Sequence, residues 1–350
     1  MNYVQTVNGL IPETELGITL AHEHVFIDSL VWFIEPKDDF FKEIRDAPIT
    51  LENIDRLRRG TNFSRNNLIV DDVDVAIEEV SHFKLYGGKT IVDLSLDGIG
   101  RNIKNLKEVS VKSGLNIIAP TGYYVENSHP KEVKNMSIDE LAKRFIDEIK
   151  IGIHGTDIKA GVIGEIGISP NGNRSEEEKV VKAAARAQLE TGAPLTVHTW
   201  GDDSSHRQPL HILDLIENEG VDLTRVYMSH MDSVDDYEYL KQIAKRKVLL
   251  SFDTFGQEFP ALFYHFRSIT PVDLDRAKTI KKLIDDGFLS QILLSHDVCK
   301  KSNLKKYGGW GFSHLLTSVN EVFDHVGITK EHLDYMFVKN PMQVLPIKKS

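Results

Sequence analysis

The sequence predicts an α/β protein folded as a single (β/α)8 TIM barrel with a short N-terminal hairpin. Three observations support this prediction: eight short apolar runs, amphipathic helical stretches between them, and a length of 350 residues. Eight strand–helix units need roughly 250 residues, so one closed barrel can account for the chain. Because no internal repeat or linker is found, we expect one domain that spans residues 1–350.

The eight predicted strands are continuous apolar runs rather than alternating ones. Such runs are typical of parallel strands that are buried on both faces. An open doubly wound sheet is the alternative, but the glycine-rich turn after its first strand is missing. In chain order the predicted strands are Gly17–Ala21, Thr90–Ser95, Asn116–Pro120, Gly161–Ile166, Pro194–Val197, Val226–Ser229, Val248–Phe252 and Gln291–Ser295.

The helices between these strands are predicted from amphipathic stretches with capping signals. Ser175 and the glutamates after it are typical of a helix start, and Gly192 is typical of its end. Strands that alternate with helices form parallel sheets with right-handed connections, which favours the barrel. Further predicted helices cover Val73–Tyr86, Ala277–Asp286 and His314–Val326.

Two segments are added to the regular barrel pattern. Asn8-Gly9, between the apolar runs Val4–Val7 and Leu10–Ile11, predicts a hairpin that we expect to cover the N-terminal end of the barrel. The stretch of Val25–Lys89 between strands one and two is longer than an ordinary connection and includes a strongly charged part. We therefore expect extra structure at this point.

Composition limits the classes of function. The chain is 41% hydrophobic and 27% charged, as in an ordinary globular protein. Its formal net charge of −10 argues against a nucleic-acid partner, since such binding needs a basic face. The single cysteine, Cys299, excludes an intrachain disulfide. The sequence shows no signal-peptide pattern and no run of about 18 apolar residues, so we expect a cytoplasmic protein without a membrane partner.

Histidines and carboxylates gather at the predicted strand ends. His22 and His24 follow strand one with one residue between them, so both side chains point the same way in extended backbone. Active sites of barrels lie at the C-terminal ends of the strands, where side chains from several strands converge. The ends of strands four, five, six and eight carry Glu165, His198, His230 and Asp297.

Each of these residues alone has an ordinary explanation. A single histidine at a strand end is more often a hydrogen-bonding partner for a loop than a metal ligand, and Glu165 could pair with a neighbouring cation. Four histidines and two carboxylates at five strand ends are harder to explain in this way, because the 14 histidines of the chain could lie anywhere in the sequence. Imidazole and carboxylate groups are also ligands that suit zinc and similar ions. The pattern therefore predicts a metal centre.

The pattern resembles the amidohydrolase superfamily and, within it, the phosphotriesterase-related family, which includes phosphotriesterases, lactonases and phosphotriesterase homology proteins. Many members bridge their metals with a carboxylated lysine on strand four. Here strand four ends in Glu165, and the nearest lysine, Lys159, stands at the start of that strand, so we assign the chain to a branch that uses glutamate. The segments that carry the resemblance span nearly the whole chain and are Thr19–His24, Asp97–Asn102, Pro120–Tyr124, Ala160–Gly167 and Gly308–Gly311.

The resemblance implies two divalent metal ions, with zinc expected and manganese or cobalt as alternatives. It also implies that the ions activate a bridging water and that Asp297 carries its proton to the leaving group, as general base and then acid. Glu23 and His296 alternate with ligands along their strands and so point away from the metals, and we expect them either to pack in the barrel or to support the site from outside. The more buried ion would be held by His22, His24, Glu165 and Asp297, and the other by Glu165, His198 and His230.

Substrate-binding residues are expected in the loops after strands three, seven and eight. Tyr124 matches the position of a tyrosine over the metal centre in lactonase relatives, so its phenol could bind a lactone oxygen. Arg276 and Lys301 could bind a phosphate or carboxylate, although a solvated lysine-rich loop is the commoner explanation for that run. The loop of Asp253–Asp275 is rich in aromatic residues and could form an apolar wall or an oligomer contact, and we expect a homodimer.

We therefore expect a binuclear metal-dependent hydrolase with a small-molecule substrate, a sugar lactone with an anionic or phosphorylated end. The alternative enzymes are an amide hydrolase and a phosphoester or phosphotriester hydrolase that use the same centre. A barrel that binds metal only for structure is a third alternative. Against it stands the complete ligand set, which includes the proton-carrying Asp297.

Overall fold

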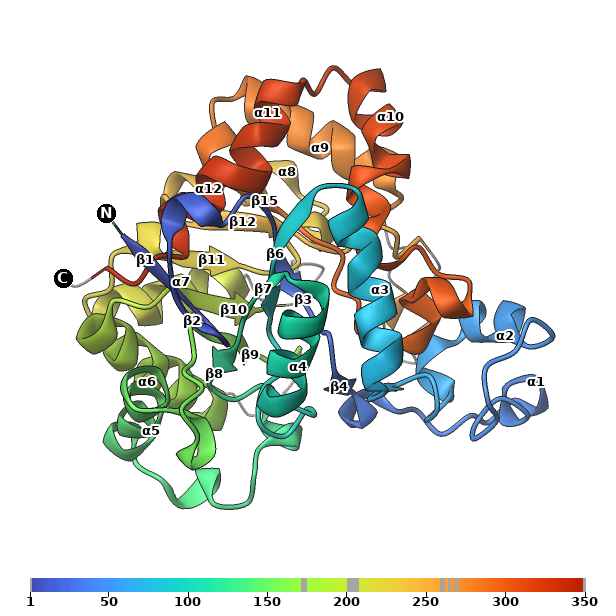
Figure 1. The fold of residues 1–350 in the computed structure, drawn as a ribbon, viewed down its shortest axis with the longest axis horizontal. Coiled ribbons are helices and arrows are strands. Elements are labelled where there is room, and N and C mark those ends of the chain that lie inside the picture. The colour runs from blue at the N-terminus through green and yellow to red at the C-terminus, as the bar shows by residue number, and fades with distance from the viewer. Residues whose placement is uncertain are drawn as a thin grey trace.

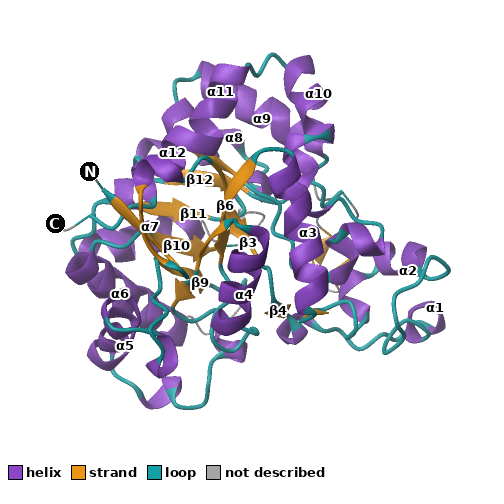
Figure 2. Ribbon diagram, viewed as in Figure 1, coloured by secondary structure: helices purple, strands orange, loops and turns teal. Residues whose placement is uncertain are grey.

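The computed structural model describes residues 2–170, 175–199, 208–258 and 271–348, together with the backbone of 262–263 and 266–267. Within these residues a cylinder of parallel strands is surrounded by helices (Figure 2). Each of the eight predicted runs overlaps an observed strand, and the (β/α)8 prediction is confirmed. The barrel strands are β3 (Ile18–Glu23), β6 (Gly88–Asp93), β7 (Asn116–Ile118) with β8 (Pro120–Thr121), β9 (Val162–Gly167), β10 (Leu195–His198), β11 (Val226–Met228), β12 (Leu249–Phe252) and β15 (Ile292–Leu294).

The strands pair in the order in which they follow one another along the chain. Parallel pairing joins β3 to β6 and β7, and joins β8 through β9, β10, β11 and β12 to β15. The strands β7 and β8 are two halves of strand three, with Ala119 between them. The barrel closes between its last and first strands, where the backbone N–H of Asp297 donates to the carbonyl oxygen of His22 at 3.3 Å.

The helices cover the outside of the barrel (Figure 1). The prediction of one continuous helix over His314–Val326 is wrong. The structure has a 3-10 helix, Gly311–Leu316, followed by α10 (Ser318–His325). The backbone of Thr317 leaves the helical region at φ −121° and ψ −92°, and its hydroxyl donates to the carbonyl oxygen of Ser313. The remaining helices of the barrel layer are α3 (Val73–Leu85), α4 (Ile103–Ser113), α5 (Ile138–Lys150), α6 (Ser175–Thr191), α7 (Gln208–Asn218), α8 (Tyr237–Lys245), α9 (Asp273–Asp285), α11 (Lys330–Asp334) and α12 (Asn340–Val344).

The interior of the barrel is filled by side chains, and the N-terminal hairpin seals one end. The hairpin strands β1 (Tyr3–Thr6) and β2 (Gly9–Pro12) pair antiparallel, and the fully buried Val4 packs among the inward-facing residues. Its turn lies at Val7-Asn8, one residue earlier than the Asn-Gly pattern predicts. Tyr3 also bridges to Ile347, so the two ends of the chain lie side by side (Figure 1). The inward-facing residues include Ala21, Val92, Leu94, Ile118, Val162, Tyr227, Leu249 and Leu293.

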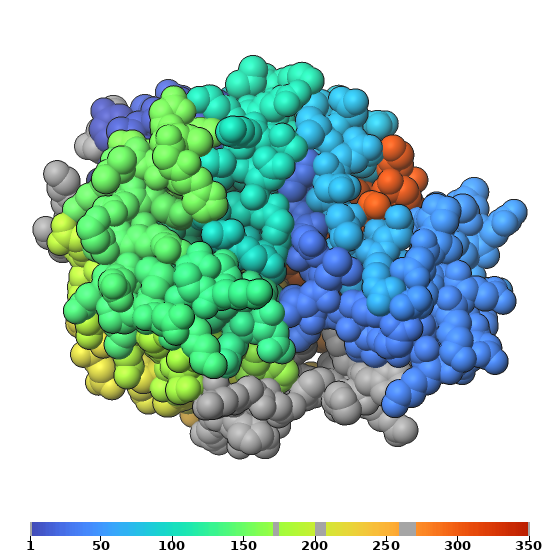
Figure 3. Space-filling view, turned by 90° about the horizontal axis from the view of Figure 1, so that it is seen from below, coloured from blue at the N-terminus to red at the C-terminus, as the bar shows by residue number. Residues whose placement is uncertain are grey.

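The long connection between strands one and two forms a lobe beside the barrel, as expected (Figure 3). It contains a two-stranded antiparallel pair, β4 (Ile27–Asp28) with β5 (Ile69–Val70), and the short helices α1 (Asp39–Lys42) and α2 (Ile54–Arg59). A small apolar core of its own holds the lobe together and includes Ile44, Leu57 and Phe63. Among the helices that the structure describes, none has both the length and the apolar composition to cross a membrane.

Candidate active site

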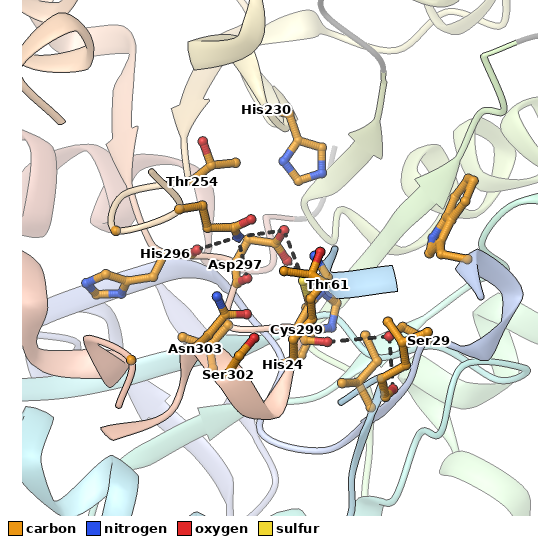
Figure 4. A pocket seen from close by; sticks show the side chains of 18 of the residues that line it. His24, Ser29, Thr61, His230, Thr254, His296, Asp297, Cys299, Ser302 and Asn303 are labelled. Atoms are coloured by element: carbon orange, nitrogen blue, oxygen red, sulfur yellow. Dashed lines mark hydrogen bonds and ion pairs between the residues drawn. The ribbon is translucent and has the colours of Figure 1, made fainter. Parts of the chain in front are cut away.

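The structure brings all six predicted ligands together at the C-terminal ends of the strands. His22 lies on β3 and His24 directly follows this strand, while Glu165 lies on β9 and His198 at the end of β10. The other two, His230 and Asp297, lie shortly after the ends of β11 and β15, and both have left-handed backbone, with φ of +60° and +50°. Figure 4 shows Asp297 in the middle of this site, with His230 on one side.

Glu165 lies at the centre of the cluster. Its Oε1 atom is 3.3 Å from Nε2 of His24, and its Oε2 atom is 3.1 Å from Nδ1 of His198. Oε2 also lies 3.5 Å from Nε2 of His22 and 3.7 Å from Nε2 of His230. One carboxylate therefore contacts all four imidazoles.

Glycine before Glu165 is required by close packing. A Cβ atom on Gly164 would lie 2.1 Å from the carbonyl oxygen of Thr196 on the neighbouring strand, and the φ of Gly164 is +106°. Lys159 lies before β9, outside the cluster, and is partly exposed. The strand-four side chain at the site is therefore the glutamate.

Asp297 contacts the histidines of strand one. Its Oδ1 atom lies 3.2 Å from Nε2 of His24 and 3.7 Å from Nε2 of His22. Its Oδ2 atom accepts a hydrogen bond from Nε2 of Gln257 at 3.3 Å. The carboxylate thus faces the cluster with one oxygen and the cavity wall with the other.

The geometry of the cluster suits divalent cations. Two groups of three, His22 with His24 and Asp297, and Glu165 with His198 and His230, each place their ligand atoms within 4.8 Å of one another. The buried Nε2 atom of His22 makes no hydrogen bond to any described residue, although it faces two carboxylates. An unpaired imidazole nitrogen that is fully buried is costly unless it binds something else, and a metal ion fits that place.

The electrostatics of the cluster also favour a cation. Burial lowers the pKa of His24, but Asp297 and Glu165 outweigh it and raise this pKa to about 9. For His230, Asp253 and Glu165 likewise outweigh burial and raise the pKa to about 10. Burial opposes ionisation of Glu165, yet the neighbouring histidines hold the pKa of its carboxyl well below the ordinary range. The carboxylates are therefore ionised at neutral pH and attract positive charge.

A layer of supporting side chains holds the histidines from behind, and the motif analysis did not identify it. Asp253 places Oδ1 2.8 Å from Nδ1 of His230 and Oδ2 2.9 Å from Nδ1 of His22. Ser229 and Ser95 place their hydroxyls 3.0 Å and 2.9 Å from Nδ1 of His22 and His24. Such contacts fix the ring orientation of metal-binding histidines. The sequence signal that could have identified Asp253 is its position directly after strand seven, at the same end of the barrel as the ligands.

Glu23 and His296 support the site from outside the cluster, as expected. Oε1 of Glu23 lies 2.7 Å from Nδ1 of His296 and accepts hydrogen bonds from the hydroxyl of Ser295 and the backbone N–H of His296. Its Oε2 atom accepts the backbone N–H of Val298 at 3.0 Å. Glu23 therefore fixes the backbone on both sides of Asp297.

A cavity of about 450 Å³ opens beside the cluster. Tyr124 lines it next to the histidines, with its hydroxyl 3.2 Å from Nε2 of His198. Trp32, from the lobe between strands one and two, and Phe255 form an apolar part of the cavity wall. The lobe contributes further lining residues. Ser302 and Asn303, in the loop after strand eight, line the same cavity as His24 and Asp297 (Figure 4).

Comparison with known proteins identifies the family. The sequence model of the Phosphotriesterase family matches residues 2–345. The chain belongs to the phosphotriesterase family. It is accordingly a hydrolase, and its candidate metal-ligand groups agree with a family of metal-dependent enzymes.

Several relatives within the family are similar over nearly their whole length. A phosphotriesterase-related protein of Nematostella vectensis is 37% identical, with 98% of each chain covered. An N-acetyltaurine hydrolase of Xenopus tropicalis is 35% identical, covering 99% of this chain and 98% of the relative.

Solved structures of similar proteins share the fold. A resiniferatoxin-binding protein of Rhodobacter sphaeroides superposes with a TM-score of 0.95 at 36% identity, covering 98% of this chain and 95% of the other. The lactonase Lmo2620 of Listeria monocytogenes superposes with a TM-score of 0.79 at 26% identity, covering 99% and 100%.

One predicted substrate residue of this phosphotriesterase-family protein, Arg276, is part of the protein interior instead. Its side chain is fully buried, with Nε 3.1 Å from Asp232 and Nη1 2.9 Å from Asp273. Its Nη2 atom donates to the hydroxyl of Thr254 and the carbonyl oxygen of Gln257. The prediction was wrong because Arg276 lies on the inner face of α9, where it pairs with buried carboxylates and does not line the cavity.

Lys301 is also displaced from its predicted role. Its ammonium lies 3.4 Å from Oδ1 of Asn66, and the residue does not line the cavity. The preceding residue, Lys300, does. The side chains of Phe259, Phe263, Tyr264 and Phe266, expected as an apolar wall or oligomer contact, lie outside the described residues.

Proposed function

We propose that the protein is a binuclear metal-dependent hydrolase that cleaves the amide bond of a small N-acylated amine with an acidic group, of the kind represented by N-acetyltaurine. The observation that carries the hydrolase part is the cluster itself, in which Glu165 contacts histidines of both ligand groups. The substrate part rests on the full-length likeness to enzymes named N-acetyltaurine hydrolase.

The ligand roles follow from the contacts. His22, His24 and Asp297 would hold one ion, His198 and His230 the other, and Glu165 would face both. Zinc fits these nitrogen and oxygen donors, with manganese or cobalt as alternatives. Divalent ions in this place supply Lewis-acid polarisation of a carbonyl group and activation of water.

Asp297 is the proposed proton carrier. Burial opposes its ionisation, but His24 and His22 lower its pKa, so the carboxylate is ionised at neutral pH and can accept a proton from water. Its position between the histidines and the cavity lets it deliver that proton to a leaving group held in the cavity. An amine or alkoxide leaves readily only when it is protonated, so this transfer is needed for amides and lactones.

Tyr124 is the proposed hydrogen-bond donor to the substrate. Burial, followed by the nearby Glu165 charge, raises the pKa of the phenol well above its ordinary value. The hydroxyl therefore keeps its proton at neutral pH. It lies on the cavity wall beside His198 and can donate to an acyl oxygen bound there.

A lactone is the second candidate substrate, and the likeness to the Listeria lactonase favours it. That likeness is at 26% identity, whereas the N-acetyltaurine hydrolase of Xenopus is 35% identical. We therefore place the amide first. The two substrates share the same attack on an acyl carbon and differ in the leaving group.

A substrate panel on the metal-loaded enzyme tests the proposal. It contains N-acetyltaurine, a sugar lactone with and without phosphate, and a phosphotriester, with release of product followed directly. We expect the highest kcat/KM for N-acetyltaurine. Preference for a lactone by tenfold or more would replace the amide assignment, and no turnover of any acyl substrate would contradict the proposed function as a whole.

A further inference from the structure

Outside the metal cluster, one arginine and one lysine line the cavity in the part of the chain that the structure describes. They are Arg58, on α2 of the lobe, and Lys300, in the loop after strand eight. Outside the metal cluster, the carboxylate among the lining residues is that of Glu258, and its Oε1 atom already accepts the backbone N–H of Asp273. The cavity wall away from the cluster is therefore positive, although the whole chain carries a net charge of −10.

The ammonium group of Lys300 makes no ion pair or hydrogen bond with any of the described residues. This distinguishes it from Lys301, whose ammonium lies near Asn66, and from Arg58, which donates to the carbonyl oxygen of Gly308 at 2.6 Å. A lysine of the cavity wall whose ammonium has no partner among the described residues is suited to bind an anionic ligand. Lys300 is the better candidate for a direct ligand contact, and Arg58 adds positive charge nearby.

The backbone directly after Lys300 is held by Asn67 of the lobe. The side chain of Asn67, fully buried, accepts the backbone N–H of Ser302 at 2.8 Å and donates to the carbonyl oxygen of Thr61 at 3.0 Å. The carbonyl oxygen of Asn67 accepts the backbone N–H of Lys301 at 2.9 Å. A fixed backbone lowers the entropy lost when the side chain binds a ligand. The lobe thus positions the lysine as well as covering the cavity.

Lys300 is also close enough to the cluster for a small substrate to reach both. Three residues of chain span at most roughly 10 Å, so the Cα atoms of Asp297 and Lys300 are within that distance. N-acetyltaurine has two carbons between its amide nitrogen and its sulfonate. With its acyl carbon at the cluster, its anionic end falls within reach of the lysine side chain.

We infer that Lys300 is a specificity-determining residue: its ammonium binds the anionic group of the substrate, a sulfonate or a carboxylate, with Arg58 strengthening the positive potential. This inference rests on the proposed function for the identity of the scissile bond. It predicts that the enzyme selects N-acyl amines with an acidic end over neutral ones of the same shape.

The kinetic experiment uses three amides with the metal-loaded enzyme: N-acetyltaurine, N-acetyl-β-alanine, and the neutral methyl sulfone of the same length. Lys300→Gln should raise KM for the two anionic amides by roughly 10- to 100-fold with kcat changed much less, because a charge-assisted contact is lost. The kcat/KM for the neutral sulfone should stay within about twofold. A larger effect on one anionic amide identifies which acid the site prefers.

Lys301→Gln is the matched control, since it removes the same charge from the neighbouring residue that does not line the cavity. Equal losses in the two variants would show a long-range charge effect and overturn the inference. Equal losses on anionic and neutral amides would overturn it as well.

A binding experiment separates failure of this inference from failure of the proposed function. Ethanesulfonate and propionate are titrated into the metal-loaded enzyme by calorimetry, which needs no turnover. Wild type and Lys301→Gln should bind one of these anions, and Lys300→Gln should bind it at least tenfold more weakly. If wild type hydrolyses no acyl substrate but shows this binding pattern, the proposed function fails and the anion site stands. Equal binding by all three proteins removes the site.

Discussion

At the scale of single residues, the histidines of the cluster depend on partners behind them. Asp253 contacts two of these rings, at His22 and His230, and is itself fully buried. Its own pKa is lowered because these two histidines outweigh the effect of burial. The position of each ring nitrogen that faces the site is therefore set by a carboxylate that faces away from the cavity.

We predict that Asp253→Asn weakens metal affinity by roughly 10- to 100-fold, the usual cost of losing a supporting contact of a metal-binding histidine. Competition with a chromogenic chelator measures it. Ser251→Ala on the same strand is the control, because its buried hydroxyl has no hydrogen-bond partner in the described structure. Unchanged affinity in Asp253→Asn would show that Ser229 and the packing suffice.

Asp297→Asn separates proton transfer from metal binding. An amide oxygen can partly replace the carboxylate as a ligand, but it cannot accept a proton. We expect kcat for an amide or lactone to fall by roughly a hundredfold to ten-thousandfold, the usual contribution of general acid–base catalysis. The metal content should change little.

The leaving group provides the internal control for Asp297→Asn. An ester of an activated phenol should lose much less, because its leaving group departs without protonation. Near-normal amide turnover with the metal retained would mean that another residue carries the proton.

At the scale of elements, Arg276 shows how a helix is fastened to a loop. From α9 its guanidinium reaches Asp232 after β11 and Thr254 after β12, while Asp273 of the same helix completes the network. The sequence predicts a cation near the end of loop seven. Its side chain points into the protein because Arg276 lies on the buried face of α9, and this orientation is seen only in the structure.

Arg276→Gln should therefore lower stability more than substrate affinity. Breaking a buried ion pair by removing one partner costs about 3–5 kcal/mol of folding free energy, because the remaining carboxylates stay buried. Urea unfolding of the variant measures the loss, with Lys278→Gln as the control on the exposed side of α9. A variant with unchanged stability but a raised KM for anionic substrates would restore the substrate-binding role.

At the scale of the whole molecule, the barrel was predictable because each strand carries its own local signal, and the strand ends of a barrel meet by topology. All six predicted ligands meet for that reason. The break at Thr317 and the choice between Lys300 and Lys301 were not predictable, because both depend on contacts with distant segments. Asn67, far away in the sequence, decides how the loop after strand eight lies.

The most direct test of the central claim, a centre of two metal ions facing Glu165, is metal stoichiometry measured together with activity. Elemental analysis of protein purified without chelator should give about two divalent ions per chain. Chelation should abolish hydrolysis, and zinc, manganese or cobalt should restore it.

In the same measurement, Glu165→Gln should lose metal and activity together, since a neutral amide binds two cations poorly. Glu258→Gln, which changes a cavity carboxylate outside the cluster, should keep both. Full activity in metal-free protein, or a Glu165→Gln variant with two ions and normal turnover, would contradict the account.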